Sequence, residues 1–90
     1  MTARRFIVSG RVQGVGFRWF VVRAAERMQV CGWTRNLPDG TVEVVAQGEP
    51  GSVASLEDVL KTGPRGARVD AVESKENEPD ANLSDFTVRH

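Results

Sequence analysis

The chain has 90 residues, of which 40% are hydrophobic and 27% charged, and its 12 basic side chains balance its 12 acidic ones. A chain of this length buries roughly 60–65% of its unfolded surface, so residues 1–90 are expected to form one domain around one core. The zero net charge disfavours nucleic-acid binding through bulk electrostatics, and no apolar run reaches the roughly 18–20 residues of a membrane span. With no signal-peptide core at the N-terminus, the sequence predicts a soluble, cytoplasmic protein with no nucleic-acid and no membrane partner.

The basic side chains gather in the first half of the chain. Residues 1–45 carry seven basic and three acidic side chains, whereas residues 46–90 carry five and nine. Cys31 is the only cysteine and His90 the only histidine, which leaves no internal disulfide, no cysteine or histidine metal cluster and no histidine-based triad. Cys31 lies in a strand-like run, so we interpret it as a buried or partly buried bystander. We expect no metal site and no cofactor.

The first two elements are predicted from a change of period. Residues 5–12 alternate, with Phe6, Val8 and Val12 on one face, which is typical of a strand. From Phe17 the apolar residues follow the period of a helix, and they are Phe17, Phe20, Val21, Ala24, Ala25 and Met28. The change of period occurs inside a glycine-rich stretch.

A hairpin is predicted next. Residues 30–36 are strand-like, and residues 41–47 alternate so that Val42, Val44 and Ala46 point inward. The intervening Leu-Pro-Asp-Gly at 37–40 is a turn, since Pro presets φ, Asp favours turns and Gly accepts positive φ. Two strands joined by so short a turn form a hairpin.

The second half predicts a helix and two strands. Ser52 is expected to cap a helix that runs to about Lys61, with Val53, Leu56 and Leu60 as its apolar stripe. Strands are expected at residues 67–75 and 85–89.

The predicted order is β-α-β-β-α-β plus a short terminal strand. This is the ferredoxin-like split βαβ arrangement of the α+β class, with a mostly antiparallel sheet and two helices on one face. This fold occurs in proteins of many different functions, so the function depends on the residues of a particular site.

The glycine-rich stretch suggests an anion site. The helix that starts near Phe17 has no Ser, Thr, Asp or Asn to cap it, an omission that costs about 0.5–2 kcal/mol. A helix N-terminus favours anions, glycines let successive amides converge, and Arg18 adds a planar fork of donors suited to phosphate. The alternative is a tight strand-to-helix turn with a solvated Arg18. Two known phosphate-binding patterns are excluded. The P-loop needs Lys-Ser/Thr after its last glycine, which is absent here, and the dinucleotide-binding pattern needs Gly or Ala at the position of Trp19.

Two segments, GRVQGVGFR (Gly10–Arg18) and GWTRNLPDGTVE (Gly32–Glu43), resemble the signature segments of the acylphosphatase family. The resemblance extends to the run at residues 63–70 and so covers essentially the whole chain. It implies a small ferredoxin-like fold, an Arg18 that holds the phosphate oxygens and an Asn36 that orients the attacking water. It also implies that a loop forms the backbone cradle of the phosphoryl group, with the residues Gly10, Arg11, Val12, Gln13, Gly14 and Val15.

Three positions depart from the family pattern. Gln29 stands where many members have Gly, and Cys31 and Thr34 replace commoner small or aliphatic residues. These departures affect packing rather than the expected chemistry, so they bear on stability more than on activity.

The resemblance implies hydrolysis of acyl phosphates to a carboxylate and inorganic phosphate. The carboxylate leaving group is stable at neutral pH, so no general acid is needed. The remaining task is positioning and charge stabilisation for in-line transfer. Among possible bases, we interpret Asp39 as a turn residue, Glu43 as an exposed strand carboxylate and Asp70 as solvated or paired.

Two other functions stay open at this stage. One is a non-catalytic module of ferredoxin-like fold that binds a small anion or docks in a larger assembly. The other is RNA binding on the sheet, which would need exposed aromatics paired on one strand, and the strand aromatics Phe6, Trp33 and Phe86 form no such pair. A monomer is expected, because the scattered apolar positions define no extra interface.

Overall fold

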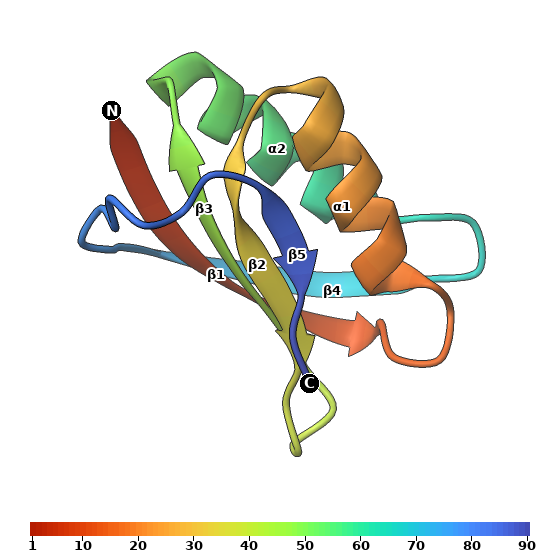
Figure 1. The fold of residues 1–90 in the computed structure, drawn as a ribbon. Coiled ribbons are helices and arrows are strands. Elements are labelled where there is room, and N and C mark those ends of the chain that lie inside the picture. The colour runs from red at the N-terminus through yellow and green to blue at the C-terminus, as the bar shows by residue number, and fades with distance from the viewer.

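The structure is a computed structural model that describes all residues from Met1 to His90. It contains two helices and one five-stranded sheet, and the predicted element order is confirmed (Figure 1). The elements are β1 (Thr2–Arg11), α1 (Phe17–Arg27), β2 (Cys31–Asn36), β3 (Val42–Gly48), α2 (Pro50–Thr62), β4 (Arg68–Glu76) and β5 (Phe86–Val88). No helix is both long and apolar enough to cross a bilayer.

The sheet has the strand order β4-β1-β3-β2-β5, with β3 at its centre. The β1–β3, β1–β4 and β2–β3 pairs are antiparallel, and only β2–β5 is parallel, which confirms a mostly antiparallel sheet. Both helices lie on the same side of the sheet, α1 against β2 and β5 and α2 against β1 and β4 (Figure 1). One face of the sheet is therefore left without a helix.

The core fills the space between the sheet and the helices. The alternating positions predicted to point inward are buried, as are the apolar stripe of α2 and most of the stripe of α1. The fully buried apolar side chains include Phe6, Val8, Val12, Phe17, Val21, Val42, Val44, Val53, Leu56 and Leu60. Phe20 and Met28 also pack against this cluster but are only partly buried.

Two predicted boundaries are wrong. Helix α2 begins at Pro50 after Glu49, without a side-chain cap, so Ser52 lies inside the helix and does not cap it. A proline in the first turn loses no hydrogen bond and has the φ that a helix requires, and this starts the helix earlier than the serine would. Strand β1 begins at Thr2 rather than residue 5, because Thr2 pairs with Gly48 of β3.

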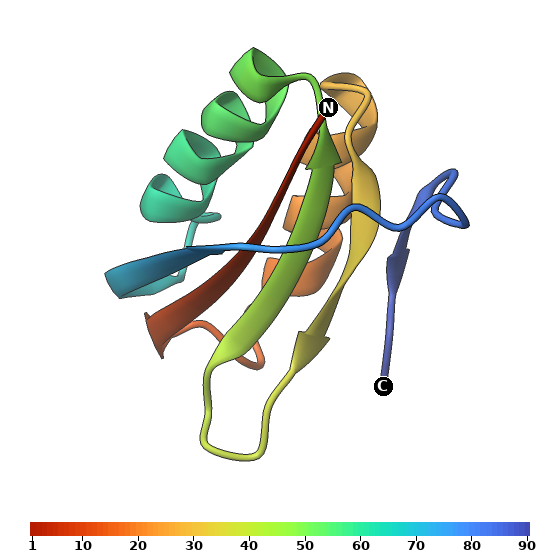
Figure 2. The same cartoon turned by 90° about the vertical axis from the view of Figure 1, so that its left-hand side faces the viewer.

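The sheet face without helices is crossed by residues 77–85, which run from β4 to β5 over the strands between them (Figure 2). The Gln47 side chain fastens this segment to β3, because its amide donates to the Asp80 carbonyl (2.8 Å) and its oxygen accepts from the Asp80 amide (2.9 Å). At the start of the segment, the Asn77 amide donates to the Ala3 carbonyl (3.0 Å). The crossing segment is thus part of the folded body.

The prediction that Glu43 is exposed is wrong. Glu43 is only 3% exposed. Its two carboxylate oxygens accept hydrogen bonds from Nε of Arg5 on β1 and from Nε of Arg35 on β2, the latter at 2.6 Å. Burial alone would raise the pKa of Glu43, but the hydrogen bonds from the two arginines outweigh it and hold this pKa below its ordinary value. Strand alternation predicts the face on which Glu43 lies, but the two arginines cover it only because β3 lies between β1 and β2.

Candidate active site

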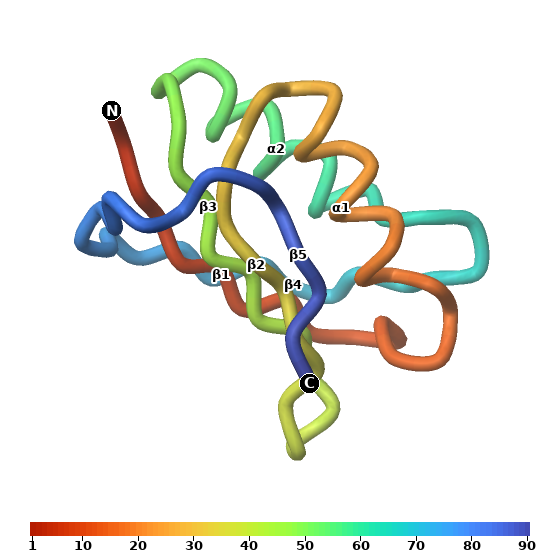
Figure 3. Tube along the Cα trace, viewed as in Figure 1, coloured from red at the N-terminus to blue at the C-terminus, as the bar shows by residue number.

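The loop between β1 and α1 turns on two glycines, and its course is visible in the trace of Figure 3. Gly14 (φ 75°) and Gly16 (φ 77°) both adopt left-handed conformations. A β-carbon at either position would meet no atom within 4 Å, so the backbone conformation, rather than lack of space, requires glycine here. Gly16 is also the N-cap of α1 and offers no side-chain hydrogen bond, which confirms the prediction of an uncapped helix.

The amides around this loop are unpaired. Phe20 is the first residue of α1 whose amide finds an acceptor, the Gly16 carbonyl at 3.1 Å. No amide from Gln13 to Trp19 donates a hydrogen bond within the protein. Unpaired amides at a helix N-terminus carry partial positive charge and form a site for an anion.

Arg18 lies in the first turn of α1 and is partly buried. Four other arginines, Arg4, Arg5, Arg35 and Arg68, donate to side chains of the protein. Arg18 makes no side-chain hydrogen bond and no ion pair. Its fork of donors is therefore free for a ligand.

Asn36 lies at the end of β2, opposite Val42 of β3. Its side-chain oxygen Oδ1 is buried and accepts no hydrogen bond from the protein. Buried polar atoms without a partner are rare in folded proteins, and each needs an explanation such as a functional role or a bound molecule. The acceptor is well suited to a water molecule or a ligand donor in the adjacent cavity.

A cavity of about 80 Å³ brings these groups together. Of the residues named from the sequence, Val12, Gly14, Arg18 and Asn36 line it. Three further residues line it that were not predicted as site residues, namely Gly16, Phe17 and Trp19. The sequence predicted the glycines and the start of the helix. It did not predict the cavity, because the cavity forms only where the loop packs beside the end of β2.

Gly10, Arg11, Gln13 and Val15 do not line this cavity. Gly10 and Arg11 are the last residues of β1 and pair with β4, where the register shifts between Ser9 and Gly10. Gly10 has φ 124°, and a β-carbon there would lie 2.1 Å from the Arg68 carbonyl oxygen. It therefore allows the close strand contact from which the loop departs, while Val15 packs against the core.

The Gln13 side chain joins the loop to the β2–β3 hairpin. Its Nε2 donates to the carbonyls of Leu37 (2.8 Å) and Thr41 (2.9 Å). The backbone amide of Leu37 also donates to the Thr41 carbonyl (2.9 Å). Leu37 directly follows Asn36, so Gln13 links the amides of the loop to the strand end that carries Asn36. In the sequence, Gln13 is a single amide side chain within a glycine-rich loop. This pattern does not predict which carbonyl groups the side chain will contact.

The other carboxylates lie elsewhere. Asp39 is a turn residue, as predicted, and accepts hydrogen bonds from the Thr41 hydroxyl (2.6 Å) and the Thr41 amide (3.0 Å), which lower its pKa. Asp70 pairs with Arg68 at 2.9 Å, also as predicted. None of Asp39, Glu43 and Asp70 lines the cavity of Arg18 and Asn36.

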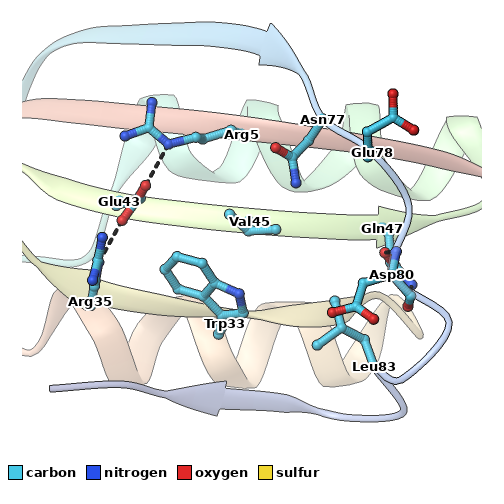
Figure 4. A pocket seen from close by; sticks show the side chains of 10 residues that line it. All are labelled: Arg5, Trp33, Arg35, Glu43, Val45, Gln47, Asn77, Glu78, Asp80 and Leu83. Carbon is cyan, nitrogen blue, oxygen red and sulfur yellow. Dashed lines mark hydrogen bonds and ion pairs between the residues drawn. The ribbon is translucent and has the colours of Figure 1, made fainter.

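A larger cavity of about 380 Å³ lies on the sheet face that carries no helix (Figure 4). Figure 4 shows Glu43 between Arg5 and Arg35 at one end, with Trp33 and Val45 at the centre. Gln47, at the other end, is bonded to Asp80. In this larger cavity the side chains of Glu43 and Gln47 have protein partners, whereas Asn36 Oδ1 at the smaller cavity has none. No group of three or more His, Cys, Asp or Glu side chains in the structure could hold a metal ion.

Comparisons of the sequence and of the structure with known proteins give the same result. The family model described as Acylphosphatase matches residues 4–88. An acylphosphatase of Koribacter versatilis is 51% identical over 85 residues, covering 94% of this chain and 77% of the relative, and one of Chlorobaculum tepidum is 50% identical, covering 98% of both. The crystal structure of acylphosphatase from Bacillus subtilis superposes with a TM-score of 0.95 at 34% identity and covers all of both chains.

Proposed function

The chain belongs to the acylphosphatase family and has the acylphosphatase activity of that family, and on this premise we propose that the cavity of Arg18 and Asn36 is its catalytic site. The observation that carries the proposal is the coexistence in one small cavity of free donors and a free acceptor. Arg18 and the loop amides are donors without partners, and Asn36 Oδ1 is a buried acceptor without a donor. Such groups cost stability when unpaired, and a bound phosphate and water would satisfy them.

The phosphoryl oxygens bind to the donors. The unpaired amides between Gln13 and Trp19 are the backbone donors, Gly14 and Gly16 set their conformation, and Arg18 adds a charged fork. Donors fixed before the reaction stabilise charge as it redistributes in the transition state without reorganising. Phosphoryl transfer depends mostly on such positioning and electrostatics.

Asn36 orients the attacking water. Its Oδ1 accepts a hydrogen bond from the water and holds it in line with the phosphorus and the leaving oxygen. A carboxamide is not a base, so the proton passes to the substrate phosphate as the bond forms. The carboxylate then leaves without protonation, so the site needs no general acid.

The products are the carboxylate and inorganic phosphate. The proposed site uses no metal, since its donors are arginine and backbone amides, and it is complete within one chain, so a monomer suffices. Hydrolysis is therefore expected to continue in the presence of a chelator and to be unaffected by added magnesium.

The test is hydrolysis of acetyl phosphate and benzoyl phosphate by the purified chain, with the variant Asn36→Ala. We expect kcat to fall about 10²-fold, while inorganic phosphate inhibits with a constant changed by less than about twofold. Asn82→Ala, which alters an exposed turn asparagine, is the matched control and should retain full activity.

Two results would contradict the proposal. An equal loss of turnover and phosphate binding in Asn36→Ala would make Asn36 a structural residue. Phosphate binding by the native chain without any hydrolysis would favour the alternative, a non-catalytic anion-binding module.

A further inference from the structure

Trp19 is an exposed aromatic that the fold does not use. It is 59% exposed, and the only other exposed large hydrophobic residue is the terminal Met1. It joins no aromatic pair and no cation–π contact, whereas Phe17 packs against Phe20 and Trp33 lies under two arginines. A single exposed apolar side chain is common on protein surfaces, so the position of Trp19, rather than its exposure alone, bears on a ligand.

Trp19 lies at the cavity that contains Arg18 and Asn36. This cavity, at about 80 Å³, is much smaller than the roughly 300–1,000 Å³ of a pocket that encloses a whole small-molecule ligand. A phosphoryl group fits this space, but an acyl group does not fit beside it. The acyl part of a bound substrate must therefore lie outside the cavity, against its rim.

The in-line geometry decides which side of the cavity the acyl group occupies. Because Asn36 Oδ1 is buried, the water that it holds in the proposed mechanism would lie on the inner side of the phosphorus. The leaving oxygen must lie opposite that water and so points to the solvent side. The exposed lining residues are on that side, and among them only Trp19 has a large apolar side chain.

We propose that Trp19 forms an acyl-group subsite that makes this enzyme prefer acyl phosphates with an aromatic or bulky apolar acyl group. The proposal rests on the proposed function, since it assumes that the phosphoryl group occupies the cavity of Arg18 and Asn36. An aromatic acyl group stacks on the indole and removes apolar surface from water, whereas an acetyl group is too small to cover the ring. Binding energy from this remote contact raises kcat/KM for the larger substrate.

The experiment compares kcat/KM for benzoyl phosphate and acetyl phosphate in the native chain, Trp19→Ala and Trp19→Phe. In Trp19→Ala we expect the benzoyl-to-acetyl ratio of kcat/KM to fall about tenfold, because the loss falls mainly on benzoyl phosphate. Trp19→Phe keeps a ring at the same place and should restore most of the ratio. Because each ratio is compared with that of the native chain, the different intrinsic reactivities of the two substrates cancel.

Each outcome bears on one hypothesis. An unchanged ratio in Trp19→Ala, or an equal fall for both substrates, overturns the subsite while leaving the proposed catalytic site intact. A native chain that hydrolyses neither substrate overturns the proposed function instead. Thermal melts of the three proteins should agree, because the side chain is mostly exposed, and a lowered melting temperature in Trp19→Ala would assign Trp19 to the fold.

Discussion

Arg18 and the pair of Arg5 and Arg35 carry the same side chain but lie in opposite surroundings. On the helix-free face of the sheet, Arg5 and Arg35 both donate through Nε to one buried carboxylate, that of Glu43. At the start of α1, Arg18 has no protein partner and shares its cavity with the unpaired Oδ1 of Asn36. The buried carboxylate of the sheet face is paired within the protein, whereas Arg18 and Asn36 Oδ1 at the loop have no protein partner.

Under the proposed function, this difference separates the polar groups that stabilise the fold from those that bind the substrate. A paired buried charge stabilises the protein only while both partners are present. An unpaired group costs stability and persists where function needs it. Substitutions in the two regions should accordingly affect different properties, stability in the first and activity in the second.

The largest expected effect is on activity, in Arg18→Lys. Lysine keeps the charge but loses the planar fork, so kcat/KM for acetyl phosphate should fall about 10²–10³-fold. The melting temperature should change little, because Arg18 has no protein partner to lose.

The matched variant for Arg18→Lys is Arg5→Lys on the sheet face. It should retain activity at 25 °C and lose about 1 kcal/mol of unfolding free energy, measured by denaturant titration. If Arg5→Lys reduced kcat/KM as strongly as Arg18→Lys, the two regions would not be functionally distinct.

The next effect is on stability, in Glu43→Gln. Replacing the carboxylate leaves two arginines facing a neutral amide, and we expect the free energy of unfolding to fall by about 2 kcal/mol, since both arginine side chains keep partial contact with water. Denaturant unfolding near pH 7 measures this change, with kcat/KM expected to stay within about twofold of native.

The stability difference between the native protein and Glu43→Gln should depend on pH in a defined direction. The pKa of Glu43 is lowered in the folded state, so its stabilising contribution is present above the ordinary carboxyl pKa and is lost as the pH falls through the lowered folded value. The stability difference between native and Glu43→Gln should therefore shrink below about pH 4. A difference that stayed constant from pH 7 to pH 3 would show that Glu43 ionisation does not stabilise the sheet face.

Gln13→Ala tests the link between the two motifs, and its effect should be smaller. Removing both hydrogen bonds to the hairpin should cost about 1–2 kcal/mol of stability and lower kcat about tenfold, because Asn36 loses its fixed position relative to the loop.

A double-mutant cycle distinguishes positioning from a purely structural role for Gln13. In an Asn36→Ala background, Gln13→Ala should reduce kcat by less than about twofold. Equal losses in both backgrounds would mean that Gln13 does not act through Asn36.

The smallest effect is expected at Gln29, which follows α1 and is the only non-glycine residue with positive φ, at 57°. Gln29→Gly removes this strain and should raise the free energy of unfolding by about 0.5–1 kcal/mol with activity unchanged. Gln29→Ala keeps a β-carbon at the strained position and serves as the control, with no gain expected. A gain in Gln29→Ala equal to that in Gln29→Gly would rule out backbone strain as the cause.

The sequence by itself determined the elements and their order, because periodicity and turn preferences depend on near neighbours. The alternation of Phe6 and Val8, the helical stripe from Phe17 and the turn ending at Gly40 were each sufficient to predict the element observed. The uncapped start of α1 was also visible, since it depends on which residue types precede the helix. The prediction failed at Ser52, where two local signals competed and the proline won.

Only the tertiary structure decided which side chains meet. Glu43 became buried because β1, 38 residues away in the chain, brings Arg5 to one side of it, while the β2–β3 hairpin brings Arg35 to the other. The bonds of Gln13 and the place of Trp19 at the cavity depend in the same way on where the β1–α1 loop meets the end of β2. Strand order and register set these long-range contacts, and no short stretch of sequence carries that information because the partners are fixed only when the whole sheet has formed.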